Sequence, residues 1–189
     1  MVKEPRPGRV KTRLARGIGT VAAAWWFRQH SAALLRRLRD RRWRLVLAVA
    51  PDQALTSRIW PADLPRLPQG RGGLGPRMAR ALAVSPRAPV CVIGADIPRL
   101  SRAHIAGAFT LLGRHDAVFG PAEDGGFWLV GVKRGALARP HMFGAARWST
   151  PHALADSVAA LSGWRIGFAD TLADVDEPAD LRRAAALWQ

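Results

Sequence analysis

Two continuous apolar runs, separated by segments with a helical pattern, restrict the fold of this chain more than any other feature. These runs are RLVLAVA (44–50) and PVCVIGAD (89–96). Apart from Arg44 at the start of the first and Asp96 at the end of the second, they contain no polar side chain larger than that of cysteine. A strand that is apolar throughout is typical of a sheet covered on both faces, as in parallel α/β sheets. The runs therefore predict buried strands in an α/β protein.

Further strands and helices are expected to alternate along the rest of the chain. Strands are predicted over 116–121, 127–133 and 164–172, with a shorter one near Leu67 inside a long connection over 53–73. Helices are predicted over 21–40, 74–84, 101–112, 151–161 and 176–188. This order predicts a three-layer α/β/α fold with a mostly parallel sheet, and 189 residues suffice for a single domain spanning 1–189.

The chain is strongly basic, with 29 Lys and Arg against 14 Asp and Glu. Residues 1–44 hold 13 of the basic and 2 of the acidic side chains. An excess of this kind suggests an anionic partner: nucleic acid, a membrane surface or a phosphorylated small molecule. A coding bias explains it equally well, because only Lys3, Lys11 and Lys133 are lysines. The lone Cys91 and the lack of a leader or membrane-length apolar run predict a cytoplasmic protein with an inert core thiol.

Acidic residues follow two of the predicted strands, where ligands of open α/β sheets bind. Asp96 ends the run 89–96, and a carboxylate there suits Mg²⁺ or Mn²⁺, although a turn or helix-cap role before Ser101 is the alternative. The segment 174–176, Asp-Val-Asp, places two carboxylates on one side of an extended chain, and one of them is expected to share a metal with Asp96. Asp180 is expected to complement the first turn of the last helix.

The segment Glu123-Asp124-Gly125-Gly126 lies between two predicted strands. Two carboxylates followed by two glycines fit a turn that faces a substrate. Asp-Gly and Gly-Gly are equally good signals for a β-hairpin, so both interpretations stay open.

The opening stretch MVKEPRPGRVKTRLARGIG is basic and rich in Pro and Gly. Lys3, Lys11 and Arg13 precede a helix expected to begin near Thr20, and a helix N-terminus attracts anions. Neither GxxxxGK[ST] nor GxGxxG occurs in this stretch. We interpret it as a phosphate-binding loop, with a disordered basic terminus as the alternative.

Several segments, taken in order, resemble the radical-SAM/selenodomain-associated transferase family. They are KEPRPGRVKTRL, LPQGRGGLGPRM, VIGADIPRL, HDAVFGPAEDGGFWLVGV, RWST and LADVDEPADL. The resemblance implies a GT-A fold of the nucleotide-diphospho-sugar transferase type, in a family often described as glycosyltransferases and partly linked to arsenosugar biosynthesis. The fold is also similar to that of molybdenum-cofactor guanylyltransferase and 2-phospholactate guanylyltransferase.

The resemblance also implies roles for individual residues. Donor phosphates and the nucleotide would be bound by Lys3, Lys11, Arg13, Gln69 and Gly70. The divalent metal would be coordinated by Asp96 and Asp176. The catalytic candidates are Glu123 and Asp124, either of which would act as the base for the acceptor hydroxyl. The substrate would be lined by Gly125, Gly126, Phe127, Trp148, Ser149 and Thr150.

The chain departs from the family pattern in three places. Gly73 stands where the family usually has Asp, and Phe127 stands where it usually has Tyr. The family's first strand should precede Lys3, yet only Met1 and Val2 are left of it. We therefore expect either a start further upstream or a domain that tolerates a shortened first strand.

Three functions follow as hypotheses. The leading one is a metal-dependent glycosyltransferase that uses Mg²⁺ or Mn²⁺, a nucleotide-activated sugar and a small-molecule acceptor. The alternative is a nucleotidyltransferase that joins a nucleoside monophosphate from a triphosphate to a phosphorylated acceptor. A basic nucleic-acid-binding module is the third, and it leaves the clustered carboxylates unexplained. No membrane span is expected, and the oligomeric state is not predicted.

Overall fold

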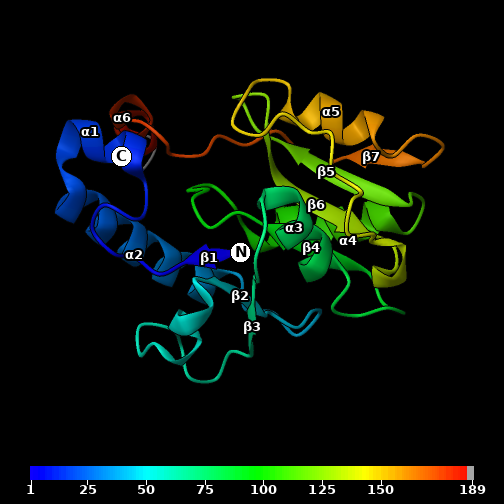
Figure 1. The fold of residues 1–189 in the computed structure, drawn as a ribbon, viewed down its shortest axis with the longest axis horizontal. Coiled ribbons are helices and arrows are strands. Elements are labelled where there is room, and N and C mark those ends of the chain that lie inside the picture. Colours follow the sequence, from blue (N-terminus) through cyan, green and yellow to red (C-terminus); the bar gives the residue numbers. More distant parts are fainter. Residues whose placement is uncertain (187–189) are drawn as a thin grey trace. The chain divides into compact units, whose positions relative to one another are not determined.

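The computed structural model describes residues 1–186, which alternate between strands and helices as the apolar runs predict (Figure 1). The residues form two compact units. The first unit comprises Met1–Pro68, Ala95–Arg102 and the chain from Ala173. The second comprises Gln69–Gly94 and Ala103–Leu172. The mixed α/β fold class predicted from the sequence is confirmed, and its parallel pairing occurs in both units.

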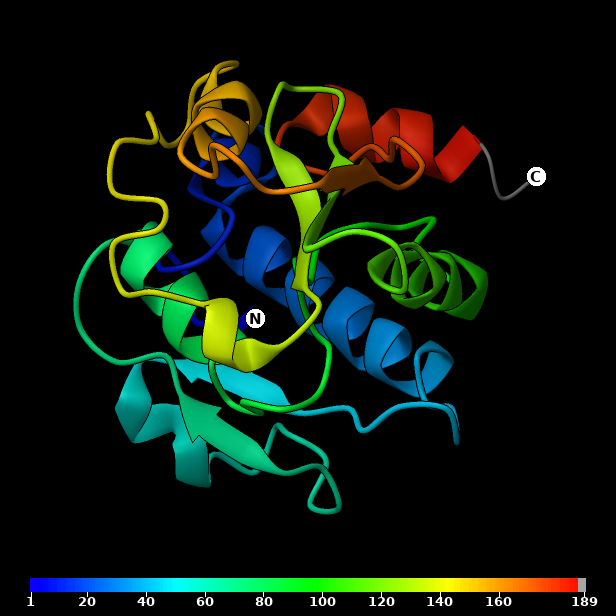
Figure 2. The ribbon, with the colours of Figure 1, turned by 90° about the vertical axis from the view of Figure 1, so that its right-hand side faces the viewer.

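The first unit contains a three-stranded parallel sheet in the order β1-β2-β3. Its strands are β1 (Val2–Lys3), β2 (Leu47–Ala50) and β3 (Arg66–Pro68), and Figure 2 shows β2 and β3 side by side. A short 3-10 helix η1 (Asp52–Thr56) follows β2. The short strand expected near Leu67 is thus β3, and the two residues of β1 pair with Val49 and Ala50.

The core of the first unit explains why the run 44–50 is apolar. All four residues of β2 are buried, and Val49 is fully enclosed. Val2 of β1, Phe27 from the helix Thr20–Arg37 and Trp60 from the long connection belong to the same cluster. The strand is apolar on both faces because both faces are covered.

Three helices complete the first unit: α1 (Thr12–Ile18), α2 (Thr20–Arg37) and α6 (Pro178–Ala186). Helix α1 packs against α2 and α6 around Leu14, Ala23 and Val175 (Figure 1). The expectation of a loop up to Thr20 is therefore wrong for α1. Leu14 supplies a fully buried anchor for this short helix, and Gly19, with a φ of 87°, separates it from α2. None of the described helices is both long and apolar enough to cross a membrane.

The second unit contains a four-stranded sheet in the order β4-β6-β5-β7. Its strands are β4 (Val90–Ile93), β5 (Ala117–Pro121), β6 (Phe127–Val132) and β7 (Ile166–Phe168). Its helices are α3 (Leu74–Leu82), α4 (Arg102–Leu112), η2 (Gly135–Leu137) and α5 (Ala153–Ala159). Strand β6 runs antiparallel to both neighbours, whereas β5 and β7 are parallel.

Trp128 of β6 anchors the second unit. Its side chain is buried, and its indole Nε1 donates a 2.9 Å hydrogen bond to the carbonyl of Asp170. A Cβ at Gly120 would lie 2.4 Å from the indole ring, so only glycine fits opposite it. In β4, burial raises the pKa of the Cys91 thiol to about 12, which agrees with the inert thiol expected from the sequence.

Candidate functional site

Three carboxylates of the first unit gather in one place. Asp96, Asp174 and Asp176 each offer an oxygen, and these oxygens lie within 4.8 Å of one another. All three residues are partly buried. The structure thus brings together Asp96 and Asp176, as the resemblance implies, and adds Asp174. The alternation Asp-Val-Asp is the sequence signal for this third member.

Buried and hydrogen-bonded backbone holds the two acidic segments together. The amide of Val175 donates a 3.1 Å hydrogen bond to the carbonyl of Asp96. The Val175 side chain is 1% exposed and packs with Leu14 and Ala23. Because successive side chains of an extended segment point to opposite sides, burial of Val175 directs Asp174 and Asp176 the other way.

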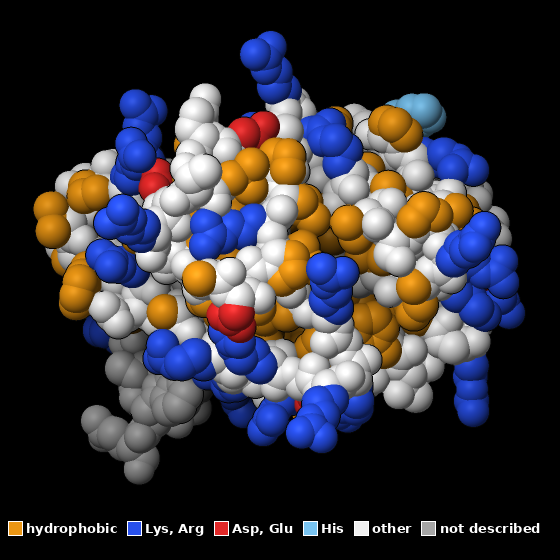
Figure 3. Space-filling model, turned by 90° about the horizontal axis from the view of Figure 1, so that it is seen from below, with side chains coloured by type: hydrophobic (Ala, Val, Ile, Leu, Met, Phe, Trp, Pro, Cys, Tyr) orange, Lys and Arg blue, Asp and Glu red, His pale blue; other side chains and the backbone are white. Residues whose placement is uncertain are grey.

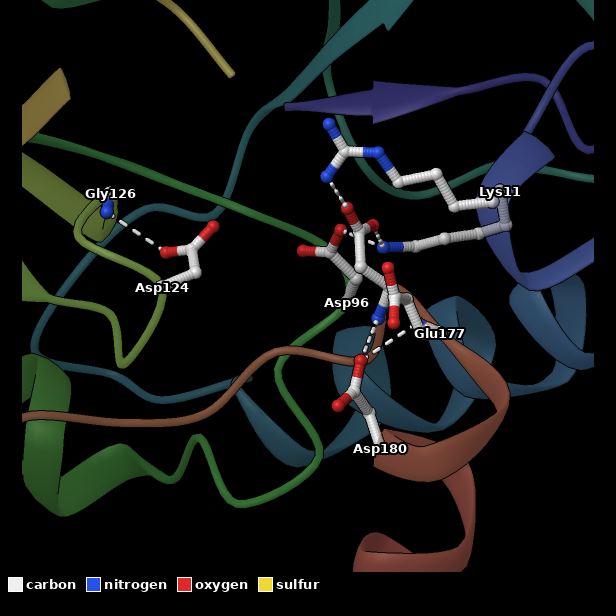
Figure 4. Close-up of polar contacts among 8 residues, drawn as sticks. Lys11, Asp96, Asp124, Gly126, Glu177 and Asp180 are labelled. Carbon is white, nitrogen blue, oxygen red and sulfur yellow. Dashed lines mark hydrogen bonds and ion pairs between the residues drawn. The ribbon is translucent and has the colours of Figure 1, made fainter. Parts of the chain in front are cut away.

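Lys11 reaches the carboxylates from the start of α1 (Figure 4). Its Nζ lies 2.5 Å from Asp96 Oδ2 and 2.8 Å from Asp176 Oδ1. Burial on its own would lower the pKa of the Lys11 ammonium, but Asp96 and Asp176 outweigh it and the pKa is raised above its usual value. Lys11 is therefore a charged group at neutral pH, held by two of the three clustered acids.

The other two predicted phosphate ligands of the first unit differ from Lys11. Arg13 lies on α1, and its Nη1 donates a 3.1 Å hydrogen bond to Asp176 Oδ2. The side chain of Arg13 is 49% exposed, so its remaining donors are open to solvent. Lys3 is exposed on β1 and forms no ion pair with a described residue. Arg13 thus belongs to the acidic cluster, whereas the structure does not bring Lys3 into it.

Asp180 serves the start of α6, as the sequence predicts. Its Oδ2 accepts hydrogen bonds from the amides of Asp176 and Glu177 at 2.9 and 2.7 Å (Figure 4). Although burial opposes the shift, these amides and Arg183 lower the pKa of the Asp180 carboxyl. Asp180 therefore caps the helix and fixes the backbone that follows Asp174 and Asp176.

Arg37 of α2 holds the turn that begins at Asp96, and sequence reasoning missed it. Its Nε donates a 2.7 Å hydrogen bond to the carbonyl of Leu100, and its Nη2 donates a 2.9 Å bond to that of Pro98. Two donors on one guanidinium fix both position and orientation of the turn. An arginine within an arginine-rich helix carries no sequence signal for this role.

The cluster fits a hard divalent cation. Mg²⁺ and Mn²⁺ prefer oxygen ligands, and two oxygens bound to one Mg²⁺ lie at most about 4.2 Å apart. Oxygens within 4.8 Å of one another reach that spacing through small side-chain rotations. The residues present therefore suit the metal that the resemblance implies.

In the second unit, the segment Glu123–Gly126 forms the turn between the antiparallel strands β5 and β6. The hairpin interpretation is thus confirmed. Asp124 Oδ1 accepts a 2.9 Å hydrogen bond from the Gly126 amide, as Figure 4 shows, whereas the Glu123 side chain is exposed and has no polar partner among the described residues. Gly125 has a φ of 83°, and a Cβ there would lie 2.2 Å from the carbonyl oxygen of Pro151.

The predicted lining residues of the second unit form a connected group beside this turn. The amide of Leu154 donates a 3.0 Å hydrogen bond to the carbonyl of Gly125, which ties the turn to the segment after Thr150. The rings of Phe127 and Trp148 meet edge to face at 6.1 Å. Ser149 has a φ of 61°, a left-handed conformation uncommon for a residue with a side chain.

Gln69 and Gly70, the predicted nucleotide ligands, lie just before α3 in the second unit. Gln69 is 6% exposed, and its carbonyl accepts hydrogen bonds from Arg80 Nε and Nη2 at 3.1 and 2.9 Å. Gly70 has a φ of 73°, so it turns the chain where residues with a Cβ are disfavoured. Arg80 thus holds this loop in shape.

The positive charge is dispersed on the face that Figure 3 shows. On the face shown in Figure 3, Lys and Arg side chains are scattered among apolar and uncharged groups, and few Asp or Glu accompany them. Many of the arginines of residues 1–44 are exposed, including Arg16 and Arg28. Exposed single arginines are typical of a solvated surface, whereas nucleic-acid modules gather them in a patch or stripe.

A crystal structure of a "putative nucleotide-diphospho-sugar transferase" from Desulfovibrio desulfuricans G20 is similar to this chain with a TM-score of 0.80 and 26% sequence identity. The similarity covers 93% of this chain and 80% of that one. No curated protein matches the sequence. The model of the DUF2064 family, described as an uncharacterized protein conserved in bacteria, matches residues 33–150, which is more than half of the chain. The chain therefore belongs to the DUF2064 family.

Proposed function

We propose that this protein is a metal-dependent glycosyltransferase that uses a nucleotide-activated sugar. The observation that carries the proposal is the cluster of Asp96, Asp174 and Asp176 beside Lys11 and Arg13. Carboxylates that suit a divalent cation, next to fixed positive charge, are what a nucleoside diphosphate needs from a protein. The similarity to a structure described as a nucleotide-diphospho-sugar transferase supports this choice among phosphate chemistries.

The residues of the first unit would bind the donor. Asp96, Asp174 and Asp176 would hold the Mg²⁺ or Mn²⁺, which when bound neutralises charge on the departing nucleoside diphosphate. Arg13 would contact the phosphates through the donors that it does not use on Asp176. Lys3, Gln69 and Gly70 stay in the proposal as further nucleotide contacts on the resemblance alone.

A base for the acceptor hydroxyl is proposed in the hairpin turn of the second unit. Glu123 is the better candidate, because its carboxylate has no hydrogen-bond partner among the described residues. One oxygen of Asp124 is already used by the Gly126 amide. Gly125, Gly126, Phe127, Trp148, Ser149 and Thr150 would shape the acceptor side.

Titration calorimetry with a nucleotide sugar and Mn²⁺ tests the donor site. A thermal-shift screen of nucleotide sugars, with and without Mn²⁺, would first select the donor, because a ligand that binds the native state raises its stability. Asp96→Ala should remove the Mn²⁺-dependent part of the binding. Asp63→Ala is the matched control, since Asp63 is an exposed acid whose ion pair among the described residues is with Arg39. Unchanged affinity in Asp96→Ala would contradict the assignment.

The reaction itself is tested by its product. Incubation with a nucleotide sugar should release a nucleoside diphosphate in a Mn²⁺-dependent way. Release of pyrophosphate from a nucleoside triphosphate would instead assign the fold to nucleotidyl transfer. We also propose that the protein is one of the radical-SAM/selenodomain-associated transferases. The same proposal includes a single domain that spans residues 1–189.

A further inference from the structure

Lys11 occupies the place between carboxylates that a divalent cation would need. Its Nζ takes one oxygen of Asp96 at 2.5 Å and one of Asp176 at 2.8 Å, and its side chain is only 6% exposed. Both acids belong to the cluster that fits the metal. The Lys11 ammonium therefore already supplies the positive charge that two of the three candidate metal ligands contact.

The main chain holds Lys11 at this point in spite of an unfavourable conformation. Lys11 has φ 47° and ψ 49°, in the left-handed region that disfavours residues with a Cβ. Its carbonyl accepts a 2.8 Å hydrogen bond from Ala15, the first of α1. Leu14 of the same helix packs on Val175, between Asp174 and Asp176. The base of the Lys11 side chain is thus anchored to the segment that carries two of the acids.

A divalent metal and the Lys11 ammonium compete for the same oxygens. Two cations held by the same carboxylates would lie only a few ångströms apart in a partly buried site, where water screens their repulsion poorly. A metal that binds the free protein must therefore displace the ammonium from at least one acid. The displaced ammonium would then be buried without a partner unless an anion arrives with the metal.

We propose that Lys11 is an internal counter-cation that excludes divalent metal from the free protein and is released when metal and a diphosphate bind together. The inference rests on the proposed function and adds to it a regulation of the same site. Metal alone would bind weakly, and metal with nucleotide would bind tightly. The ammonium freed from Asp96 and Asp176 would pair with the phosphates.

Mn²⁺ alone is the probe for the first test, with free Mn²⁺ measured by electron paramagnetic resonance on the full chain. Lys11→Met keeps the stem and removes the charge, so it should bind Mn²⁺ roughly tenfold more tightly than the native protein, within the usual range of coupling between two sites. Arg16→Met is the matched control, an exposed basic residue of α1, and should match the native protein. Equal or weaker Mn²⁺ binding by a folded Lys11→Met would overturn the proposal.

A second measurement needs no variant. The chain has three lysines, Lys3, Lys11 and Lys133, so brief acetylation followed by mass spectrometry reports each one separately. At one fixed pH, Lys11 should be labelled slowly in the free protein and faster when Mn²⁺ saturates the site, while Lys133 stays constant. Unchanged labelling of Lys11, at a Mn²⁺ concentration where electron paramagnetic resonance shows the metal bound, would overturn the proposal even if Lys11→Met did not fold.

The two proposals fail in different ways. Mn²⁺ binding by neither the native protein nor Lys11→Met would remove the metal site and the proposed function with it. Equal binding by both would remove only the competition by Lys11. Nucleoside diphosphate added with Mn²⁺ should raise the Mn²⁺ affinity of the native protein more than that of Lys11→Met, because only the native protein has an ammonium to displace.

Discussion

The Val175 amide donates a 3.1 Å hydrogen bond to the Asp96 carbonyl, which joins two segments far apart in the sequence. One segment follows β4 and the other leads into α6. Because this hydrogen bond uses main-chain atoms only, it brings the two segments together without using the carboxylates of Asp96, Asp174 or Asp176. Val175 also fills the core beside Leu14, which couples the geometry of the acids to the packing of α1.

Val175→Ala should therefore reduce both stability and metal affinity. Loss of two buried methyl groups and the resulting cavity should lower the free energy of unfolding by about 2 kcal/mol. Val118→Ala is the matched control, because Val118 is fully buried in β5 of the second unit. Urea unfolding should show similar losses in both variants, whereas Mn²⁺ affinity should fall only in Val175→Ala. Equal Mn²⁺ affinity in the two variants would separate Val175 from the site.

Arg37→Lys should loosen the turn after Asp96. Lysine keeps the charge but cannot donate to the carbonyls of Pro98 and Leu100 with the fixed geometry of the guanidinium. A carbonyl left without its donor costs about 1–3 kcal/mol. Urea unfolding measures this loss, and calorimetry should show weaker Mn²⁺-dependent nucleotide binding. Arg36→Lys, at an exposed neighbouring position, should change neither the stability nor the nucleotide binding. A loss of stability of the same size in Arg36→Lys would refute the role of Arg37 in holding the turn.

The sequence predicts the strands of this fold better than the assembly of its site. The run 44–50 is apolar because every residue of β2 is buried, and such a pattern needs no knowledge of the partners. In β4 only Val92 is buried and the other three residues are partly exposed, so the buried strand expected over 89–96 is found only in part. Strand β6 is different: the sequence order of strands does not reveal that it pairs antiparallel with both β4 and β5. Helix α1 was missed because its seven residues hold a single buried anchor, Leu14, too short a pattern to show a period.

Local motifs predict which residues carry charge, and tertiary structure decides what that charge contacts. The positions of Asp96 and Asp176 after predicted strands mark them as candidates, but their convergence depends on a hydrogen bond between main chains, which side-chain types do not predict. Lys11 was expected on phosphate, whereas in this structure it lies on two carboxylates. Arg37 was indistinguishable from its arginine neighbours because its partners are carbonyl groups, which every residue has.

His30 makes the stability of the first unit dependent on pH. Its ring stacks on Trp26 with centroids 5.0 Å apart, and its Nε2 is buried without a partner among the described residues. Burial lowers the pKa of His30 from 6.5 to about 4, with Arg37 and Lys11 adding to the shift and Asp96 opposing it. Between these two values the unfolded chain binds a proton that the native protein does not. The free energy of unfolding should therefore fall as the pH falls from 6.5 to about 4.

His30→Phe should make this dependence weaker, since phenylalanine keeps the stacking on Trp26 and cannot bind a proton. Urea unfolding across the same pH range measures the slope for the native protein and the variant. His141→Phe is the control, because His141 is exposed and its loss should leave the slope unchanged. A native slope that survives in His30→Phe would show that another group binds the proton.

Glu123→Gln should lower turnover without weakening donor binding. Glu123 is exposed on the hairpin turn with no side-chain partner among the described residues, so its carboxylate is available to take a proton from an acceptor hydroxyl. Loss of a general base lowers kcat by about 10²–10⁴. Asp124→Asn should lower kcat much less, because the asparagine side chain can still accept the hydrogen bond from the Gly126 amide that Asp124 accepts at 2.9 Å. Steady-state kinetics at saturating donor separates the two residues. A large loss confined to Asp124→Asn would move the base to Asp124, and full activity in both variants would exclude this turn from proton transfer.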